Sequence, residues 1–195
     1  MSKQLRTVNT EFNTREEDGE LYIEGYFAVF NSNYEIADGM SESISPGAFE
    51  EALGGDIRAL TNHDTTLVLG RNKANTLELK EDSHGLWGRI RINPNDSNAM
   101  DTYARVKRGD VDGCSIGFDI ESERTDFLDN GDVHWTIEKV MPLYEVSCCT
   151  FPAYKETNIS AREKQRDEIV KREREMWKAK MKERLHNGTE SINEA

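Results

Sequence analysis

A serine that follows a helical pattern and precedes a strand pattern is the feature that most restricts the fold of this chain. Residues 113–118 read Gly-Cys-Ser-Ile-Gly-Phe, with the serine at position 115. The range 97–108 has apolar residues at helical spacing and stops at Gly109, while apolar residues alternate after Ser115 as in a strand. The nucleophile elbow of an α/β-hydrolase has the same Gly-x-Ser-x-Gly letters but requires the opposite order, strand and then helix. We therefore expect Ser115 to open a strand, and the letters alone are typical of a tight turn.

Ser115 is nevertheless a candidate nucleophile. Glycines on both sides of a serine let the backbone bend sharply and let a substrate carbonyl approach without meeting a Cβ. Strand alternation places Ser115 on the same face as Gly117 and Asp119, opposite the apolar residues. We expect its hydroxyl to point away from the main core and to face a cleft.

Charge and cysteine usage exclude several classes of function. The net charge is -12 and 32% of residues are charged, which argues against nonspecific binding to nucleic acid or to an anionic membrane. The three cysteines include an adjacent pair and no Cys-x-x-Cys, and the four histidines are far apart, so we expect no metal and no cofactor. An odd cysteine count favours a reducing compartment. No apolar run has the length of a signal or membrane segment, so we expect a soluble protein made in a cytoplasm.

Short alternating segments joined by turn signals predict an α+β domain over residues 1–160, centred on a mostly antiparallel, closed or nearly closed β-barrel with flanking helices. Ser45 and Pro46 have the pattern of a helix N-cap and first helical residue, and Gly25 suggests a bulge. The expected strands are an edge strand around Leu5 and Val8, and the ranges 20–30, 57–63, 77–80, 86–92, 114–120, 133–140 and 143–150, the last ending at Pro152.

Composition changes at about residue 160. Residues 161–195 contain ten Lys or Arg against eight Asp or Glu, with few apolar residues. The apolar residues fall near one helical stripe, which predicts a long, charged and weakly amphipathic helix. Two interpretations of this tail stay open: a solvated helix folded against the body, or a detachable arm that binds a partner.

Catalysis by a serine hydroxyl needs a base within hydrogen-bond reach and a third group that orients the base. His63, at the end of the expected strand 57–63, is the candidate base, whereas the other histidines lie in a polar turn, next to a turn and in the charged tail. Glu145 is the candidate third member, because a carboxylate on an apolar strand is costly to bury without a partner. The alternatives are an ordinary surface or core histidine and an edge-strand glutamate that faces water.

Five motifs, over about residues 20–156, occur in an order that is similar to a known family. They read Gly-Tyr-Phe-Ala-Val-Phe-Asn at 25–31, Ile-Ser-Pro-Gly-Ala-Phe at 44–49, Leu-Thr-Asn-His-Asp at 60–64 with Leu-Gly at 69–70, Gly-Cys-Ser-Ile-Gly-Phe at 113–118, and Glu-Val-Ser at 145–147 leading to Thr-Phe-Pro-Ala at 150–153. In these motifs the chain resembles the prohead proteases of tailed bacteriophages, which cut scaffold segments from capsid proteins during head assembly. That family is related in fold to the herpesvirus assemblins.

The resemblance implies a serine endopeptidase with a herpesvirus-protease-like barrel, in which Ser115 is the nucleophile, His63 the base and Glu145 the third member. It implies as partners the scaffold segment of the major capsid protein and further copies of the chain itself, which would be cleaved inside the assembling prohead in the host cytoplasm. It implies no cofactor, nucleic acid or membrane.

The chain departs from the assemblin pattern at two points. Assemblins use a second histidine as third member, and here the comparable stretch holds Glu145. Assemblins also have an arginine pair after the third member, whereas residues 151–154 read Phe-Pro-Ala-Tyr. The resemblance then leaves the oxyanion to backbone amides near Ser115 or to an arginine from elsewhere.

Two other classes of function stay open at this level. One is a catalytically silent capsid-assembly or scaffold protein on the same fold, and self-cleavage of purified protein would distinguish the protease from it. The other is an esterase-like hydrolase, which the order of helix and strand around Ser115 disfavours.

Overall fold

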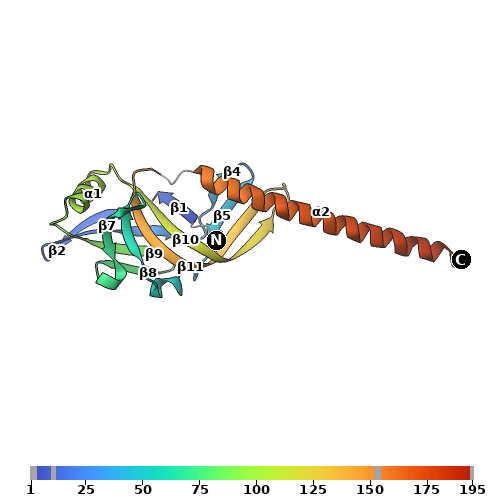
Figure 1. Ribbon diagram of the computed structural model, residues 1–195, viewed down its shortest axis with the longest axis horizontal. Helices are drawn as coiled ribbons and strands as arrows, with labels where there is room; N and C mark the ends of the chain where they lie inside the picture. Colours follow the sequence, from blue (N-terminus) through green and yellow to red (C-terminus); the bar gives the residue numbers. More distant parts are fainter. Residues whose placement is uncertain (1–3, 10–11, 152–154, 194–195) are drawn as a thin grey trace. The chain divides into compact units, whose positions relative to one another are not determined.

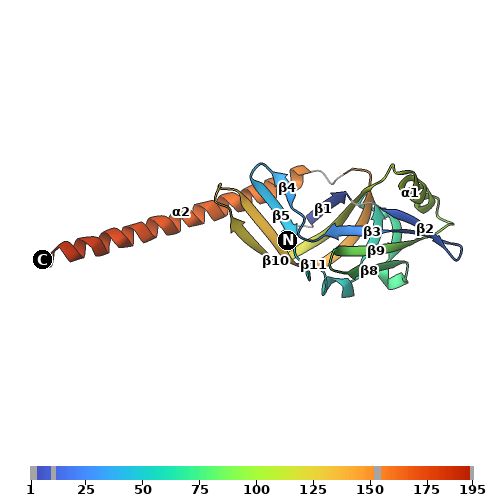
Figure 2. The same cartoon turned by 180° about the vertical axis from the view of Figure 1, so that it is seen from behind.

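The computed structural model describes residues 4–9, 12–151 and 155–193 of the chain (Figures 1 and 2). Two compact units are distinguished, Met1–Lys155 (unit 1) and Glu156–Ala195 (unit 2). Unit 1 contains the strands and the helix α1, and unit 2 contains nearly all of the long helix α2. The residues expected to matter for chemistry are all in unit 1.

The larger sheet of unit 1 is organised around its longest strand, β11. One side of β11 pairs with β10 along most of its length, and the other side pairs in parallel with β5 near its start and with β6 near its end. The end of β11 is therefore a central position with strands on both sides. The strands of this sheet are β1 (Gln4–Asn9), β10 (Gly113–Phe127), β11 (Val133–Cys149), β5 (Met40–Ile44), β4 (Tyr34–Ala37), β6 (Arg58–Thr61) and β7 (Asp64–Arg71).

The smaller sheet is antiparallel throughout its described strands and has the order β2-β3-β9-β8. The expected hairpin of 77–80 with 86–92 is confirmed, and Leu86, Ile90 and Ile92 are buried as the alternation predicted. The expected bulge of the first long strand lies at Phe27, not at Gly25, because the register with β9 shifts between Tyr26 and Ala28. The strands are β2 (Asn13–Glu17), β3 (Glu20–Val29), β8 (Leu77–Glu81) and β9 (Gly85–Ile92).

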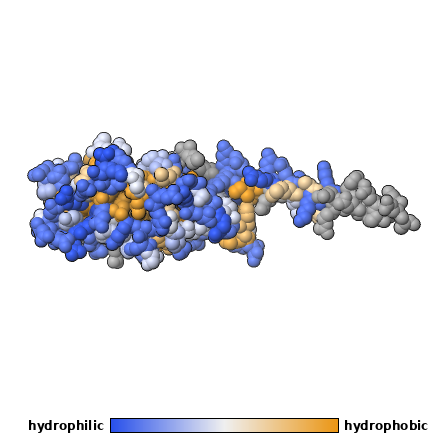
Figure 3. Space-filling view, turned by 90° about the horizontal axis from the view of Figure 1, so that it is seen from below, coloured by the Kyte–Doolittle hydropathy of each residue, from blue (hydrophilic) through white to orange (hydrophobic). Residues whose placement is uncertain are grey.

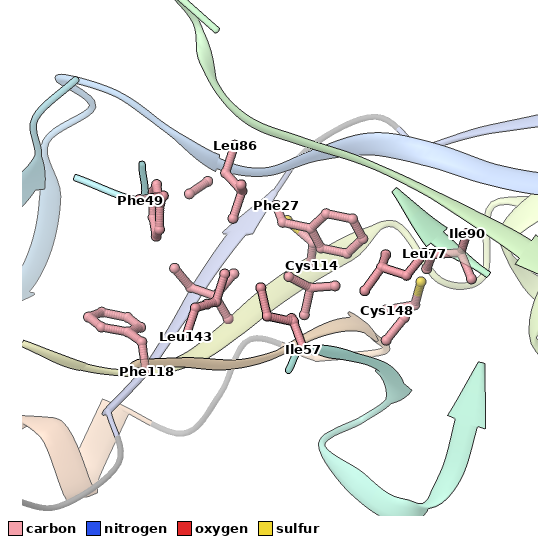
Figure 4. Packing of buried hydrophobic residues seen from close by; sticks show 14 of the residues in the cluster. Phe27, Phe49, Ile57, Leu77, Leu86, Ile90, Cys114, Phe118, Leu143 and Cys148 are labelled. Carbon is pink, nitrogen blue, oxygen red and sulfur yellow. The ribbon is translucent and has the colours of Figure 1, made fainter. Parts of the chain in front are cut away.

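The hydrophobic core joins the apolar faces of the two sheets. Figure 4 shows Phe27 of the smaller sheet beside Cys114 of the larger one, and Leu86 and Phe118 belong to the same cluster. Burying one aromatic or aliphatic side chain of this kind completely adds about 1.5–3 kcal/mol to the stability of the fold. The core thus uses one face of β10, and the opposite face of β10 is left for other contacts.

The expected closed barrel is not found among the described strands, which form two separate hydrogen-bonded sheets. The mixed α+β class with mostly antiparallel pairing is confirmed. Alternation of apolar and polar residues only requires each strand to cover one face, and two packed sheets satisfy this as well as a closed one. The alternation of apolar and polar residues therefore does not indicate whether the strands close into a barrel.

One predicted helix is present and one is not. The helix α1 (Ser97–Arg108) ends at Gly109 as expected, with Asp96 as its N-cap. Residues 46–51 instead form turns, followed by two short 3₁₀ segments, η1 (Ala52–Gly54) and, later in the chain, η2 (Asn72–Ala74). Ser45 does not cap a helix, because both its amide and its hydroxyl donate to the carbonyl oxygen of Ile137 on β11.

The two expected strands 133–140 and 143–150 are a single strand, β11, that continues through Pro142. The pairing with β5 ends at Ile137 and the pairing with β6 begins at Glu145, so no ladder partner on that side requires an amide hydrogen from Pro142. The Asp129–Asp132 turn between β10 and β11 is confirmed, with Gly131 in the left-handed region. The expected end of this strand at Pro152 lies outside the described residues.

The helix α2 (Lys155–Asn193), which makes up most of unit 2, agrees with the helix expected for the tail. Among its described side chains, Val170, Met176 and Trp177 are largely exposed. The face of unit 1 seen in Figure 3 is mostly hydrophilic around a central apolar area. Within the described residues, no helix is long and apolar enough to span a membrane.

Candidate active site

His63 lies in the tight turn between β6 and β7, not at the end of a strand as expected. Thr61 pairs with Asp64, and the two intervening residues, Asn62 and His63, both have positive φ, 50° and 61°. This is the backbone of a two-residue hairpin turn, and asparagine and histidine are among the non-glycine residues that adopt positive φ most often. Asn62 fixes the turn to the end of β11, because its amide donates to the carbonyl oxygen of Cys148 (2.9 Å) and its side-chain oxygen accepts from the amide of Thr150 (2.9 Å).

Glu145 is the partner of the His63 ring. Oε1 of Glu145 lies 2.7 Å from Nδ1 of His63, and the Glu145 side chain is only 3% exposed, against 17% for His63. The edge-strand interpretation of Glu145 is wrong, since β11 has β10 on one side and β6 on the other at this position. A buried carboxylate in contact with an imidazole holds the Nδ1–H tautomer and leaves Nε2 as the basic nitrogen.

An irregularity in β11 is what directs Glu145 away from the core. Gly117 pairs with Glu145 and Phe118 pairs with Leu143, so Tyr144 is an extra residue without a register partner. Leu143 and Val146 are both in the hydrophobic cluster, although regular alternation would place Leu143 and Glu145 on one face. The bulge reverses the alternation. Glu145 shares a face with Ser147 as expected, but the expectation that it also shares a face with Leu143 is wrong.

Ser115 is in β10, directly opposite Ser147 of β11 in the register. Its orientation away from the apolar residues agrees with the sequence, but the expected exposure to a cleft is wrong because Ser115 is completely buried. Its hydroxyl donates to the carbonyl oxygen of Arg6 on β1 (2.9 Å). Within the described residues, no hydrogen bond joins the hydroxyl of Ser115 to His63.

Cys149 is the residue in contact with the other ring nitrogen of His63, and sequence reasoning did not single it out. Its Sγ lies 3.7 Å from Nε2. Burial raises the pKa of the Cys149 thiol to about 12, and the nearby charge of Glu145 adds to the effect. The thiol is therefore neutral at physiological pH, a state that is a poor nucleophile. The sequence signal that could have pointed to Cys149 is its position two residues beyond Ser147, on the same face of the strand as Glu145.

Ser147 also contacts both members of the pair. Its hydroxyl donates to Oε2 of Glu145 (2.6 Å) and accepts from the amide of His63 (3.3 Å). Two other carboxylates, Asp64 next to His63 in the sequence and Asp119 on the strand of Ser115, are engaged elsewhere: Asp64 accepts from Thr66, and Asp119 accepts from the hydroxyl of Tyr144.

Two other histidines of unit 1, His84 and His134, have no part in this arrangement. His84 lies in the turn before β9 and contacts the ring of Tyr26, and His134 lies between Ser41 and Ser43. Among the residues that the structure describes, no cluster of His, Cys, Asp and Glu has the arrangement of a metal site.

The sequence pattern of the caudovirus prohead serine protease family matches residues 8–172, which include His63, Ser115 and Glu145. This chain belongs to that family. It is 32% identical over 163 residues to the prohead protease of Enterobacteria phage HK97, an alignment that covers 82% of this chain and 68% of the relative. The family assignment makes the chain a protease.

The fold is similar to that of a solved capsid assembly protease, from bacteriophage T4. The TM-score is 0.51 at 14% identity, and the match covers 77% of this chain and 98% of the other. At this identity the likeness extends to the fold alone.

Proposed function

We propose that this chain is a serine endopeptidase of phage head maturation in which Ser115, His63 and Glu145 are the catalytic residues. The observation that carries the proposal is the buried contact of Glu145 Oε1 with His63 Nδ1, 2.7 Å long, on the face of the sheet that Ser115 shares. Membership of the prohead serine protease family supports the same reaction class. No metal or cofactor takes part in the proposed mechanism.

The proposed chemistry is acyl transfer through the serine hydroxyl. Ser115 Oγ attacks the carbonyl carbon of the scissile peptide bond while His63 Nε2 takes the hydroxyl proton. Glu145 accepts the hydrogen bond from Nδ1 and stabilises the imidazolium that forms. The imidazolium then gives its proton to the leaving amine, and a water molecule activated by His63 releases the acyl group from Ser115.

In this mechanism the described arrangement is a resting state. The hydroxyl of Ser115 donates to Arg6, and Cys149 Sγ lies next to Nε2 of His63. Attack on a substrate requires the Ser115 hydroxyl to leave the carbonyl oxygen of Arg6 and to donate to Nε2. Catalytic hydrogen bonds that form only in the substrate complex are common in this type of enzyme.

The proposed substrates are the scaffold segment of the major capsid protein and other copies of the protease itself. The names of the relatives support this, since one is a prohead protease and the structural neighbour is a capsid assembly protease. The proposed place of action is the inside of the assembling prohead in the host cytoplasm, where high local concentration makes even a weak enzyme sufficient. The relation to the herpesvirus proteases stays part of the proposal.

The test is cleavage of the cognate capsid precursor by purified protein, with the new termini identified by mass spectrometry. We expect Ser115→Ala and His63→Ala each to abolish cleavage, with losses of about 10⁶-fold as for other catalytic serine–histidine units. Two matched controls are Ser122→Ala, an exposed serine of the same strand, and His84→Ala, a histidine in another turn. Both controls should cleave at the wild-type rate.

Each alternative predicts a different result. A catalytically silent assembly protein would cut neither the precursor nor itself, in any variant. An esterase would hydrolyse small esters through Ser115 without cutting peptide bonds. Cleavage at the wild-type rate by Ser115→Ala would remove Ser115 from the mechanism, and a loss in only one of the Ser115 and His63 variants would remove the base assignment.

A further inference from the structure

We infer that Ser147 is a positioning residue of the active site: its hydroxyl fixes the carboxylate of Glu145 and the turn of His63 relative to each other. The inference rests on the proposed function of the Glu145 and His63 pair. Ser147 is completely buried on β11, two residues after Glu145. It has no exposed surface that a substrate could contact, so it acts only through the neighbouring residues.

The first contact that carries the inference is with the carboxylate. The Ser147 hydroxyl donates to Oε2 of Glu145 at 2.6 Å, while Oε1 of the same group is 2.7 Å from Nδ1 of His63. A carboxylate held at both oxygens cannot rotate about its terminal bond without breaking one of the two interactions. A hydrogen bond to a carboxylate is stronger than a neutral one, and this bond is buried.

The second contact is with the backbone that carries the base. The Ser147 oxygen accepts from the amide of His63 at 3.3 Å. A serine hydroxyl has one donor and two acceptor positions, so it can serve Glu145 and His63 at the same time. The His63 backbone has φ 61°, a conformation that non-glycine residues keep only when neighbouring contacts hold it.

Together the two contacts make a closed ring of interactions. It runs from the His63 amide to Ser147, from Ser147 to Glu145 Oε2, and from Glu145 Oε1 to His63 Nδ1. A shift of the imidazole relative to the carboxylate breaks one member of this ring. Ser147 is also the register partner of Ser115, so it lies directly opposite the proposed nucleophile on the neighbouring strand.

The kinetic test uses Ser147→Ala and Ser147→Cys with a peptide that spans the site identified in the capsid precursor. Losing one buried hydrogen bond to a charged group corresponds to a fall in kcat of about 10- to 100-fold, with KM unchanged. Cysteine restores most of the volume but is a weak donor, so we expect Ser147→Cys to stay close to Ser147→Ala. Full activity in Ser147→Cys would show that Ser147 only fills space and would overturn the inference.

The second readout does not depend on cleavage. Nitrogen NMR of histidine-labelled protein in the Ser115→Ala background distinguishes the Nδ1–H from the Nε2–H tautomer of His63. With Ser147 present we expect mainly Nδ1–H, and in Ser147→Ala/Ser115→Ala we expect a mixture, because the carboxylate has then lost the hydrogen bond at Oε2 that sets its orientation toward Nδ1. An unchanged tautomer together with an unchanged kcat would overturn the inference, even if the variant melts at a lower temperature.

These outcomes are separable from failure of the proposed function. If Ser115→Ala keeps full activity, the proposed nucleophile is wrong, whereas the tautomer experiment still tests the role of Ser147. If Ser115→Ala and His63→Ala are inactive but Ser147→Ala has the wild-type kcat and tautomer, only the inference about Ser147 fails. Ser122→Ala serves as the control for a serine whose loss alters no buried hydrogen bond.

Discussion

The hydroxyl of Ser115 donates a 2.9 Å hydrogen bond to the main-chain carbonyl oxygen of Arg6, on the strand next to it. The guanidinium of Arg6 in turn contacts the buried carboxylate of Glu42 on β5, including a 2.9 Å bond to Oε2. Besides its pairing with β10, strand β1 is therefore held by the hydroxyl of Ser115 and, elsewhere in the sheet, by an ion pair. Access to Ser115 in the proposed mechanism depends on how easily β1 moves.

Removal of β1 should make Ser115 more reactive. We expect a chain without residues 1–9 to react with a fluorophosphonate probe several-fold to about tenfold faster, because a hydrogen bond worth roughly 1 kcal/mol no longer holds the hydroxyl. Mass spectrometry after timed labelling measures the rate, and Ser115→Ala shows the background. The short chain should carry Glu42→Gln, so that the loss of Arg6 does not leave the buried carboxylate of Glu42 without that cation, and the long chain should keep both Arg6 and Glu42. Equal labelling rates in two folded proteins would contradict the prediction.

Glu145→Gln should be slow but measurable. Removing the orienting carboxylate of a triad costs about 10⁴-fold in kcat, compared with about 10⁶-fold for the nucleophile or base. Kinetics on the capsid-derived peptide checks the order of the three variants. The matched control is Glu138→Gln, an exposed glutamate of the same strand. An unaltered rate in Glu145→Gln would move the third role to Asp64 or Asp119.

Cys149→Ala should keep nearly full activity, although Cys149 Sγ is in contact with His63 Nε2. The reason is that burial raises the pKa of the thiol to about 12, so the thiolate is scarce at neutral pH. Peptide cleavage by Cys149→Ala and by Ser115→Ala, measured side by side, gives the comparison. A loss in Cys149→Ala as large as that in Ser115→Ala would instead identify the cysteine as the nucleophile.

The same thiol makes stability depend on pH above 9. The ordinary pKa of the group is 9.0 and its folded value is about 12, so the thiol is protonated in both states below pH 9 and its contribution is constant there. Between pH 9 and 12 the unfolded chain loses this proton and the folded chain keeps it, so the free energy of unfolding falls as pH rises. We expect the fall in the free energy of unfolding from pH 8 to pH 10.5 to be about 2 kcal/mol smaller in Cys149→Ala than in the wild-type protein. Urea unfolding at both pH values measures this, and identical pH dependence in both proteins would show that Cys149 does not contribute.

The C-terminal helix should be trimmed by the active protein. A charged helix with largely exposed apolar residues such as Met176 and Trp177 gains little from burial, and weakly held segments are cut readily. We expect wild-type protein to lose mass from the C-terminal side of about residue 160 during incubation, and Ser115→Ala to stay whole. A tail that survives in active enzyme, and that resists an added protease as well as unit 1 does, would show an integral helix of the domain.

Local pattern in the sequence was sufficient for the elements that depend on nearest neighbours. The helix 97–108, the hairpin of β8 and β9 and the turn at Asn130-Gly131 follow from periodicity and turn chemistry, which involve contacts within a few residues. The choice of His63, Ser115 and Glu145 came from residue types and motif order, and the structure brings His63 and Glu145 together.

Only the tertiary structure decided the faces, neighbours and exposure of these residues. The extra residue Tyr144 turns Glu145 out of the core, the two-residue loop places His63 over the end of β11, and β1 covers Ser115. Each of these depends on which strand pairs with which and in what register, and a one-residue change in register moves a side chain to the opposite face. The sequence of a single strand holds its alternation but not its partner, so the burial of Ser115 by a strand more than 100 residues away could be determined only by the folded chain.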